Sequence, residues 1–318
     1  MAEITHRTIK TNGIEMHIAE AGSGPLVLML HGFPESWYSW RHQLPALADA
    51  GYHAGAPDVR GYGGTDKPRE IEAYSMKQMT ADAVGVLDAL GETTAVVVGH
   101  DWGAPMAWHS ALLYPDRFRA VVGMSVPYTP RAPMPPTTIF KQMFTNNFFY
   151  ILYFQKPGVA EAELEADPRR SLRLFLYSAS GDAPQEGTFW LKPKEATFLQ
   201  GLKDPEQLPS WLTEADLDYF TSQFEKSGFR GPLNRYRNMD RDWEELPQLA
   251  GAKIQQPALF IAGERDGVIA MNPSGIETMK QHVPHLRNVL LLPGAGHWTQ
   301  QERPADVNTA LIEFLKGL

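Results

Sequence analysis

The sequence predicts an α/β fold in which a mostly parallel central sheet is flanked by helices and interrupted by a helical insertion. Short apolar segments alternate with helix-like segments up to residue 125, and the alternation resumes at residue 258. Such alternation is typical of parallel strands joined by crossover helices. The segment between them is rich in aromatic residues and has no clear strand pattern. We therefore expect two core parts, 1–129 and 247–318, separated by a helical lid (cap) over 130–246.

The first core part is predicted from apolar runs and from the turn residues that bound them. Two amphipathic strands, 6–10 and 14–20, are joined by the turn-forming pair Asn12-Gly13. Four further strands, mostly short apolar runs, are expected over 26–30, 53–57, 94–98 and 120–125. Helices are expected over 37–50, 75–90 and 104–114, the first two ended by Gly51 and Gly91.

The predicted lid begins where prolines accumulate, at positions 127, 130, 133, 135 and 136. Asp167 before Pro168 is typical of a capped helix start. Thr213 and Asp216 have the spacing of a capping box, and the helix that they begin ends at Gly228. The core then resumes with buried strands over 258–262 and 289–292 and a closing helix over 304–315.

Composition limits the classes of function. The 318 residues are 43% hydrophobic and 21% charged, which is ordinary for a globular protein. A net charge of −8 argues against nucleic acid and anionic membranes as partners. The chain has no cysteine, so disulfides and thiolate chemistry are excluded. It begins without an apolar signal segment, and its apolar runs are too short to insert into a membrane. We therefore expect a cytoplasmic enzyme.

The pentapeptide Gly-His-Asp-Trp-Gly at 99–103 has the pattern of a nucleophile elbow, with Asp101 at the position of the nucleophile. Asp and Gly are also common in ordinary turns, but a strand-like segment precedes this one and a helix-like segment follows it. The helix would place its positive end at the Asp101 carboxylate. An ionised carboxylate attacks a saturated carbon that bears a leaving group and leaves an ester for water to cleave.

An acid and then a histidine are expected after the nucleophile, each at the end of a late strand. Asp266 follows the strand predicted to end at Ala262, and His297 follows the one predicted to end at Leu292. Either residue alone would be read as part of a loop. Three matching positions in the right order predict that Asp266 orients His297 as a base beside Asp101.

The loop His-Gly-Phe-Pro at 31–34 is placed to complete an oxyanion hole. The backbone N–H of Trp102, directly after the nucleophile, is one expected donor, and that of Phe33 is the other. Pro34 favours a cis bond in this tight turn. No two histidines have the spacing of a zinc motif such as His-Glu-x-x-His, so we expect no metal.

Over essentially its whole length the chain resembles the soluble epoxide hydrolases of the α/β-hydrolase superfamily, and in particular the hydrolase domain of the vertebrate enzyme without its phosphatase domain. The resemblance is carried by 31–34, 99–103, Gly-Ala-Gly-His-Trp at 294–298, and the lid segments 153–158 and 228–238. It implies the α/β-hydrolase fold and the hydrolysis of epoxides to vicinal diols without a cofactor. The partners would be water and a small apolar epoxide, derived from a lipid or a xenobiotic. The implied role of the protein is detoxification.

The resemblance also implies that Tyr153 and Tyr236 project from the lid toward Asp101. Opening an epoxide generates an alkoxide, and tyrosine, with a reference pKa of about 10, still holds a proton to donate at neutral pH. We expect the substrate pocket to be lined by the aromatic residues Phe33, Trp102, Phe154 and Trp298.

Three alternatives remain open at this stage. A haloalkane or haloacid dehalogenase uses the same Asp-His-acid arrangement, but halide favours side-chain N–H donors, and Phe33 provides none. A serine esterase fits poorly, because Ser125 and Ser180 lack the elbow pattern. A catalytically silent member of the fold would bind a small molecule without turnover. The oligomeric state is also open, with a homodimer as one alternative.

Overall fold

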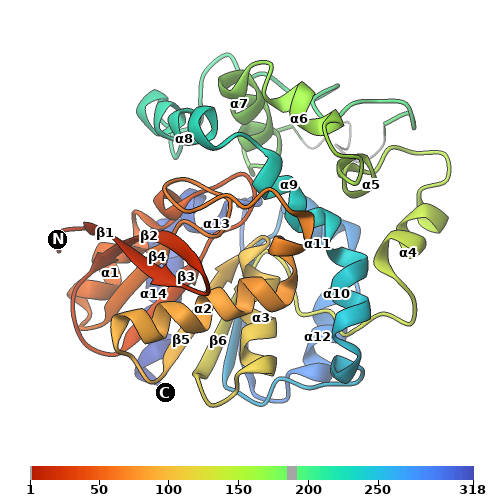
Figure 1. Ribbon diagram of the computed structural model, residues 1–318. Helices are drawn as coiled ribbons and strands as arrows, with labels where there is room; N and C mark the ends of the chain where they lie inside the picture. The colour runs from red at the N-terminus through yellow and green to blue at the C-terminus, as the bar shows by residue number, and fades with distance from the viewer. Residues whose placement is uncertain (1, 185–191) are drawn as a thin grey trace.

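The computed structural model describes residues 2–184 and 192–318, which form a single central sheet with helices on both sides and a helical layer above one edge (Figure 1). Within these residues the sheet has eight strands, in the order β1 (Thr5–Thr11), β2 (Ile14–Ala21), β4 (His53–Pro57), β3 (Leu26–Leu30), β5 (Ala95–His100), β6 (Phe118–Met124), β7 (Ala258–Gly263) and β8 (Leu286–Leu292). β2 pairs antiparallel with β1 and β4, and all other pairs are parallel. The predicted fold class is confirmed.

The first core part contains six strands, close to those predicted. They are β1 (Thr5–Thr11), β2 (Ile14–Ala21), β3 (Leu26–Leu30), β4 (His53–Pro57), β5 (Ala95–His100) and β6 (Phe118–Met124). The helical elements are η1 (Trp37–Trp40), α1 (Gln43–Asp49), η2 (Ile71–Tyr74), α2 (Met76–Leu90) and α3 (Gly103–Leu113). The single helix predicted over 37–50 is wrong. It is two elements, because the ring of Pro45 in α1 is incompatible with a continuous helix through Arg41, four residues earlier.

The described part of the segment 130–246 contains helices joined by irregular loops, and its one β-type pairing is an isolated bridge between Asn147 and Pro193. Its helices are α4 (Pro136–Met143), α5 (Tyr150–Phe154), α6 (Val159–Leu164), α7 (Pro168–Ser178), α8 (Glu214–Ser227), α9 (Arg230–Arg237) and α10 (Met239–Glu245). The predicted caps are present, since Asp167 accepts the N–H of Arg170, and Thr213 and Asp216 form a capping box. Figure 1 shows α5 to α9 above the sheet edge. The limits 130 and 246 of this lid stay our proposal.

The second core part completes the sheet. It contains η3 (Pro247–Leu249), β7 (Ala258–Gly263), α11 (Gly267–Met271), α12 (Gly275–His282), β8 (Leu286–Leu292), α13 (Thr299–Glu302) and α14 (Pro304–Lys316). No helix among the described residues is both long and apolar enough to cross a membrane.

The central strand β5 shows why the buried strands read as continuous apolar runs. Val97 packs with the cluster that contains residues of α2 and α3, whereas Val96 and Val98 pack with the cluster that contains residues of α1 and α14. Successive side chains of a strand point to opposite faces, and helices cover both faces of this sheet. Every position along β5 is therefore buried.

Parallel pairing brings the ends of four strands to one edge of the sheet, beneath the lid. Leu30 of β3 pairs with Gly99 of β5, and Gly263 of β7 pairs with Leu292 of β8. Because sites on such folds form beyond the carboxyl ends of the strands, the loops that follow β3, β5, β7 and β8 are the ones positioned to build it.

Candidate active site

The turn between β5 and α3 holds Asp101 in a conformation that few residues adopt, with a φ of 50°. A Cβ on Gly99 would lie 1.9 Å from the carbonyl oxygen of Gly103, and one on Gly103 would lie 1.9 Å from that of Leu30. Both flanking positions therefore require glycine. This sharp turn presents the Asp101 carboxylate at the end of the sheet, as the elbow pattern predicts.

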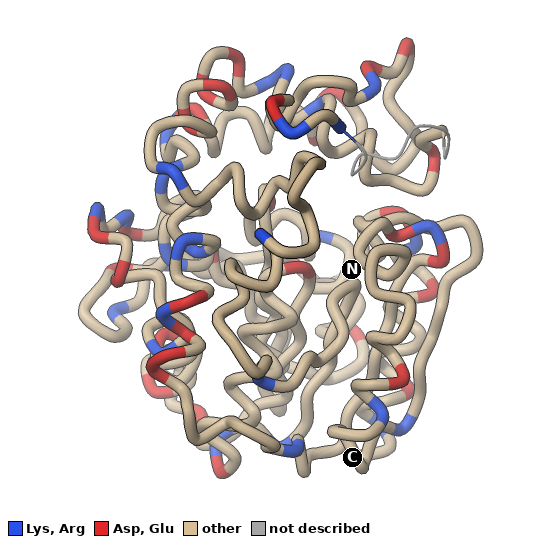
Figure 2. Tube along the Cα trace, turned by 90° about the vertical axis from the view of Figure 1, so that its right-hand side faces the viewer, with Lys and Arg blue, Asp and Glu red and all other residues tan. Residues whose placement is uncertain are grey.

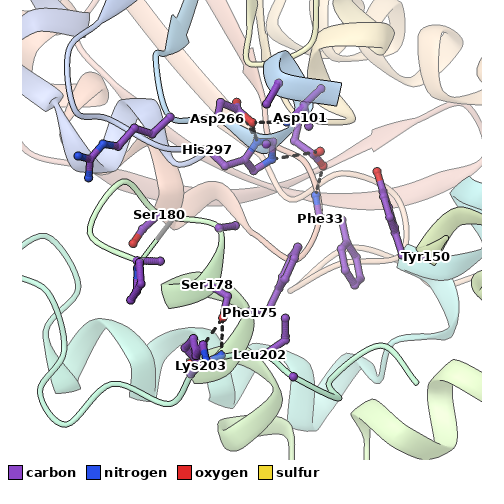
Figure 3. A pocket seen from close by; sticks show the side chains of 18 of the residues that line it. Phe33, Asp101, Tyr150, Phe175, Ser178, Ser180, Leu202, Lys203, Asp266 and His297 are labelled. Carbon is purple, nitrogen blue, oxygen red and sulfur yellow. Dashed lines mark hydrogen bonds and ion pairs between the residues drawn. The ribbon is translucent and has the colours of Figure 1, made fainter. Parts of the chain in front are cut away.

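His297 lies between two carboxylates (Figure 3). Its Nδ1–H donates to Asp266, whose two carboxylate oxygens lie at 3.0 and 3.1 Å, and its Nε2 lies 3.3 Å from Oδ2 of Asp101. Asp266 is fully buried, and its carboxylate also accepts the N–H of Val268 at 2.8 Å. The structure therefore brings the three predicted residues together, with the acid on the far side of the imidazole from Asp101.

The charges of this trio shift one another's protonation. Burial alone would lower the pKa of His297, but Asp266 and Asp101 raise it well above its usual value. Burial would likewise raise the pKa of Asp266, but His297 and the N–H of Val268 hold it below the usual value. The imidazole of the resting site is therefore stabilised in its protonated form by the two carboxylates.

The loop after β3 contacts Asp101 directly. The backbone N–H of Phe33 donates to Oδ1 of Asp101 at 2.7 Å, and the peptide bond between Phe33 and Pro34 is cis, as predicted. A Cβ on Gly32 would lie 2.3 Å from Asp101 Oδ1 and 2.7 Å from the backbone nitrogen of Trp102. Of the two predicted N–H donors, that of Phe33 is therefore bonded to the Asp101 carboxylate, and the absence of a side chain at Gly32 leaves room for the backbone of Trp102 close by.

Two tyrosines of the lid face this carboxylate across a cavity. Tyr236 of α9 and Tyr150, the first residue of α5, both line the cavity together with Asp101 and His297. Their ring centroids lie 6.0 Å apart, and the Tyr236 ring packs edge-on against Phe33 at 5.6 Å. Burial, followed by the charge of Asp101, raises the pKa of each phenol above its usual value. Both hydroxyls therefore keep their protons at neutral pH.

Tyr153, which was predicted to face Asp101, does not line the cavity, so this prediction is wrong. Its hydroxyl donates to Oε2 of Glu163 at 2.9 Å, and this carboxylate also accepts the N–H groups of Phe198 and Leu199. Tyr153 is only partly buried, and the carboxylate that its hydroxyl contacts belongs to the lid itself. Sequence reasoning missed Tyr150, because nothing in the sequence distinguishes these two tyrosines of one apolar segment.

The cavity runs from the nucleophile past Phe175 to the turn at Leu202 and Lys203 (Figure 3). Of the four aromatic residues predicted to line it, only Phe33 does so. Phe154 and Trp298 are fully buried within the lid and between lid and core, and the indole N–H of Trp298 donates to the carbonyl of Leu176. Trp102 lies behind Tyr236, with ring centroids 5.1 Å apart. The predictions for these three residues are wrong, because their rings pack against protein.

The chain is similar to known proteins over nearly its whole length. Residues 25–304 match the family model described as alpha/beta hydrolase fold. The chain is 48% identical to epoxide hydrolase A of Mycobacterium tuberculosis, covering 100% of this chain and 99% of that protein. It is 43% identical to bifunctional epoxide hydrolase 2 of Sus scrofa over 96% of this chain and 54% of that one. The solved structure of an epoxide hydrolase from an endophytic Streptomyces superposes with a TM-score of 0.96 at 50% identity, covering 99% of this chain and 96% of that one.

Proposed function

This chain belongs to the epoxide hydrolases of the alpha/beta hydrolase fold, and we propose that it converts an epoxide to a vicinal diol through a covalent ester on Asp101. One observation carries the proposal. The Asp101 carboxylate lies against the His297 imidazole on one side and the Phe33 N–H on another, and it lines the same cavity as two protonated phenols. A nucleophile, a base and two acids therefore surround a single enclosed space.

In the first step the hydroxyls of Tyr150 and Tyr236 bind the epoxide oxygen. A carboxylate oxygen of Asp101 forms a bond to one ring carbon, and the electron pair of the breaking C–O bond moves to the ring oxygen. That oxygen takes a proton from a phenol, so a neutral hydroxyalkyl ester results. The raised pKa of each phenol favours its protonated form, which is the form that can donate this proton.

In the second step His297 removes a proton from water, and the resulting hydroxide attacks the ester carbonyl carbon of Asp101. The backbone N–H groups of Phe33 and Trp102 stabilise the oxyanion of the tetrahedral intermediate. When this intermediate collapses, the ester C–O bond breaks, the leaving alkoxide takes the proton of the attacking oxygen, and the diol and the Asp101 carboxylate result. Asp266 stabilises the imidazolium that forms. Esterification removes the Asp101 charge, so His297 loses one of the groups that raise its pKa. The imidazolium then releases its proton to solvent, the phenolate takes a proton back from solvent, and the neutral imidazole can accept a proton from water.

The cavity also supports an apolar substrate. Phe33, Phe175, Leu202 and Val268 contribute apolar side chains to its wall, and apolar surface favours apolar ligands. The phenols supply the proton that an alkoxide needs and a halide does not, so the geometry favours an epoxide over a haloalkane. The cytoplasmic location, the homodimer and the role in detoxification remain predictions.

The test is to trap the ester. In His297→Gln the nucleophile is intact and the base is lost, so incubation with styrene oxide should add the mass of one substrate to Asp101, as intact-protein and peptide mass spectrometry would show. His285→Gln is the matched control, since His285 is exposed on the loop before β8, and it should turn over normally without accumulating ester. Unmodified His297→Gln protein after a single turnover would contradict the covalent mechanism.

A further inference from the structure

The loop that carries His297 is held by a carboxylate that takes no part in the reaction proposed above. Glu302 is the last residue of α13, and its side chain accepts the backbone N–H of Gly296 at 2.8 Å and that of Trp298 at 2.9 Å. These are the residues directly before and after His297. One side chain therefore fixes the backbone on both sides of the catalytic imidazole.

The same carboxylate also reaches the lid. The oxygen that accepts Gly296 also accepts the N–H of Gly181 at 2.9 Å, 121 residues earlier in the chain. The backbone N–H of His297 itself donates to the carbonyl of Ala179 at 2.9 Å, and the guanidinium of Arg265 donates to the carbonyl of Gly181 at 2.8 Å. The lid turn 179–181 is thus joined to the loop of the base directly, by the bond from His297 to Ala179, and through the Glu302 carboxylate, which accepts one N–H from the turn and two from the loop.

The backbone of the lid turn 179–181 packs directly against the backbone of the loop that carries His297. A Cβ on Gly296 would lie 2.2 Å from the nitrogen of Gly181, and a Cβ on Gly181 would lie 2.0 Å from the carbonyl oxygen of Gly294. No side chain fits between the lid turn and the loop, so their spacing is fixed by backbone geometry and by the carboxylate that binds both. A small displacement of this lid turn is therefore transmitted to the backbone of His297.

The charge on Glu302 strengthens these bonds. Burial raises the pKa of Glu302 above its usual value, and the N–H groups of Gly296, Gly181 and Trp298 act in the opposite direction. Hydrogen bonds to an ionised acceptor are roughly twice as strong as those between neutral groups. A partly buried carboxylate with three such donors is a rigid anchor.

We propose that Glu302 is a positioning residue for the second half of the reaction, which holds His297 at the angle needed to activate water and links that angle to the position of the lid turn 179–181. The inference rests on the proposed function, because it assigns Glu302 to ester hydrolysis and not to ester formation. Asp101 is held by the turn after β5 and by the N–H of Phe33, and neither contact involves Glu302. Loss of the anchor should therefore separate the two steps.

The imidazole would not be released entirely. The carbonyl oxygen of His297 also accepts a hydrogen bond from Ser125 Oγ at 2.9 Å and lies 2.7 Å from Nε2 of the buried His100. These contacts keep the loop in place while its N–H side loosens. Removing the Glu302 charge should therefore displace the imidazole and slow its proton transfer, but it should not remove the base from the site.

The experiment compares Glu302→Gln with the wild type in single turnovers on styrene oxide, followed by rapid quench and mass spectrometry. The amide keeps the size of the side chain but presents N–H groups to some of the backbone donors. We expect the rate of ester formation to stay within about threefold, and the rate of ester hydrolysis to fall about 10- to 100-fold, so that the ester accumulates. Glu264→Gln, an exposed glutamate in the loop after β7, is the matched control and should change neither rate.

Glu302→Asp keeps the charge on a shorter side chain and should recover part of the hydrolysis rate, which a purely steric role would not predict. Unchanged hydrolysis in Glu302→Gln would overturn the inference, as would an equal slowing of both steps together with a lower melting temperature. His297→Gln separates this outcome from a failure of the mechanism. If His297→Gln traps ester and Glu302→Gln does not, only the role of Glu302 is wrong, whereas no ester in either variant contradicts the covalent reaction.

Discussion

The edge of the sheet and the lid place their functional side chains by different means. Asp101, Asp266 and His297 each follow a strand, and their positions are set by backbone pairing and by turns that admit only glycine at certain sites. Tyr150 and Tyr236 lie on short helices, α5 and α9, whose orientation depends on what their other faces pack against. Local sequence therefore specifies the first group, and tertiary packing specifies the second.

The two regions also differ in the charge that they contribute to the site. Figure 2 shows that acidic and basic residues are spread along the chain in both the lid and the core. At the site, however, the charges of the trio Asp101, His297 and Asp266 all come from the sheet edge, while the lid contributes two neutral phenols. In the proposed mechanism the sheet edge thus supplies the nucleophile and the base, and the lid supplies the acids. Substitutions in the two regions should affect different steps.

The largest effect is expected at the sheet edge, for Asp266→Asn. Asp266 is one of the groups that raise the pKa of His297, so its loss lowers that pKa and removes the partner that orients the ring. Because only the neutral imidazole accepts a proton, ester hydrolysis rises as the pH increases through this pKa, and the rise should move to lower pH in the variant. We also expect a fall of about a thousandfold in the hydrolysis rate, measured by single turnovers across a pH series. A rise that moves to higher pH would contradict the assigned pairing.

An intermediate effect is expected in the lid, where the three tyrosines test its geometry directly. Tyr150→Phe and Tyr236→Phe should each slow ester formation about 100-fold, because each removes a proton donor to the epoxide oxygen. Tyr153→Phe is the matched control from the same helix, and it should change that rate by less than about twofold. Pre-steady-state quench experiments measure all three. A large loss in Tyr153→Phe alone would show that the lid rotates about α5 when substrate binds.

The smallest effect is expected where the lid rests on the core outside the cavity. The indole N–H of Trp37 donates to the hydroxyl of Tyr219 in α8 at 2.7 Å, and the ring of Tyr219 stacks on Tyr38 at 4.1 Å. Tyr219→Phe loses the hydrogen bond and keeps the stack, so the free energy of unfolding should fall by about 1 kcal/mol with little change in turnover. Urea denaturation and steady-state assays measure the two quantities. A large loss of turnover would mean that this contact sets the position of the active-site tyrosines.

The comparison also explains how far sequence reasoning reached. The elbow glycines and the strand-end positions of Asp266 and His297 were recognisable because each is fixed by the few residues around it. The choice between Tyr150 and Tyr153 depended on Glu163, a residue of another helix, and no local pattern reports such a contact. The sequence also gives no way to tell that Phe154 and Trp298 lie outside the cavity, because an aromatic ring in the core and one in a binding site look identical in sequence.

The glycines at 99 and 103 have a consequence for directed evolution of this chain. Because any side chain at either position would collide with backbone oxygen, a saturation library at these sites should return almost no folded, active clones. Substitutions intended to change the substrate are better made at cavity residues of the lid such as Phe175 and Leu202, which line the cavity but lie outside the turn that holds Asp101.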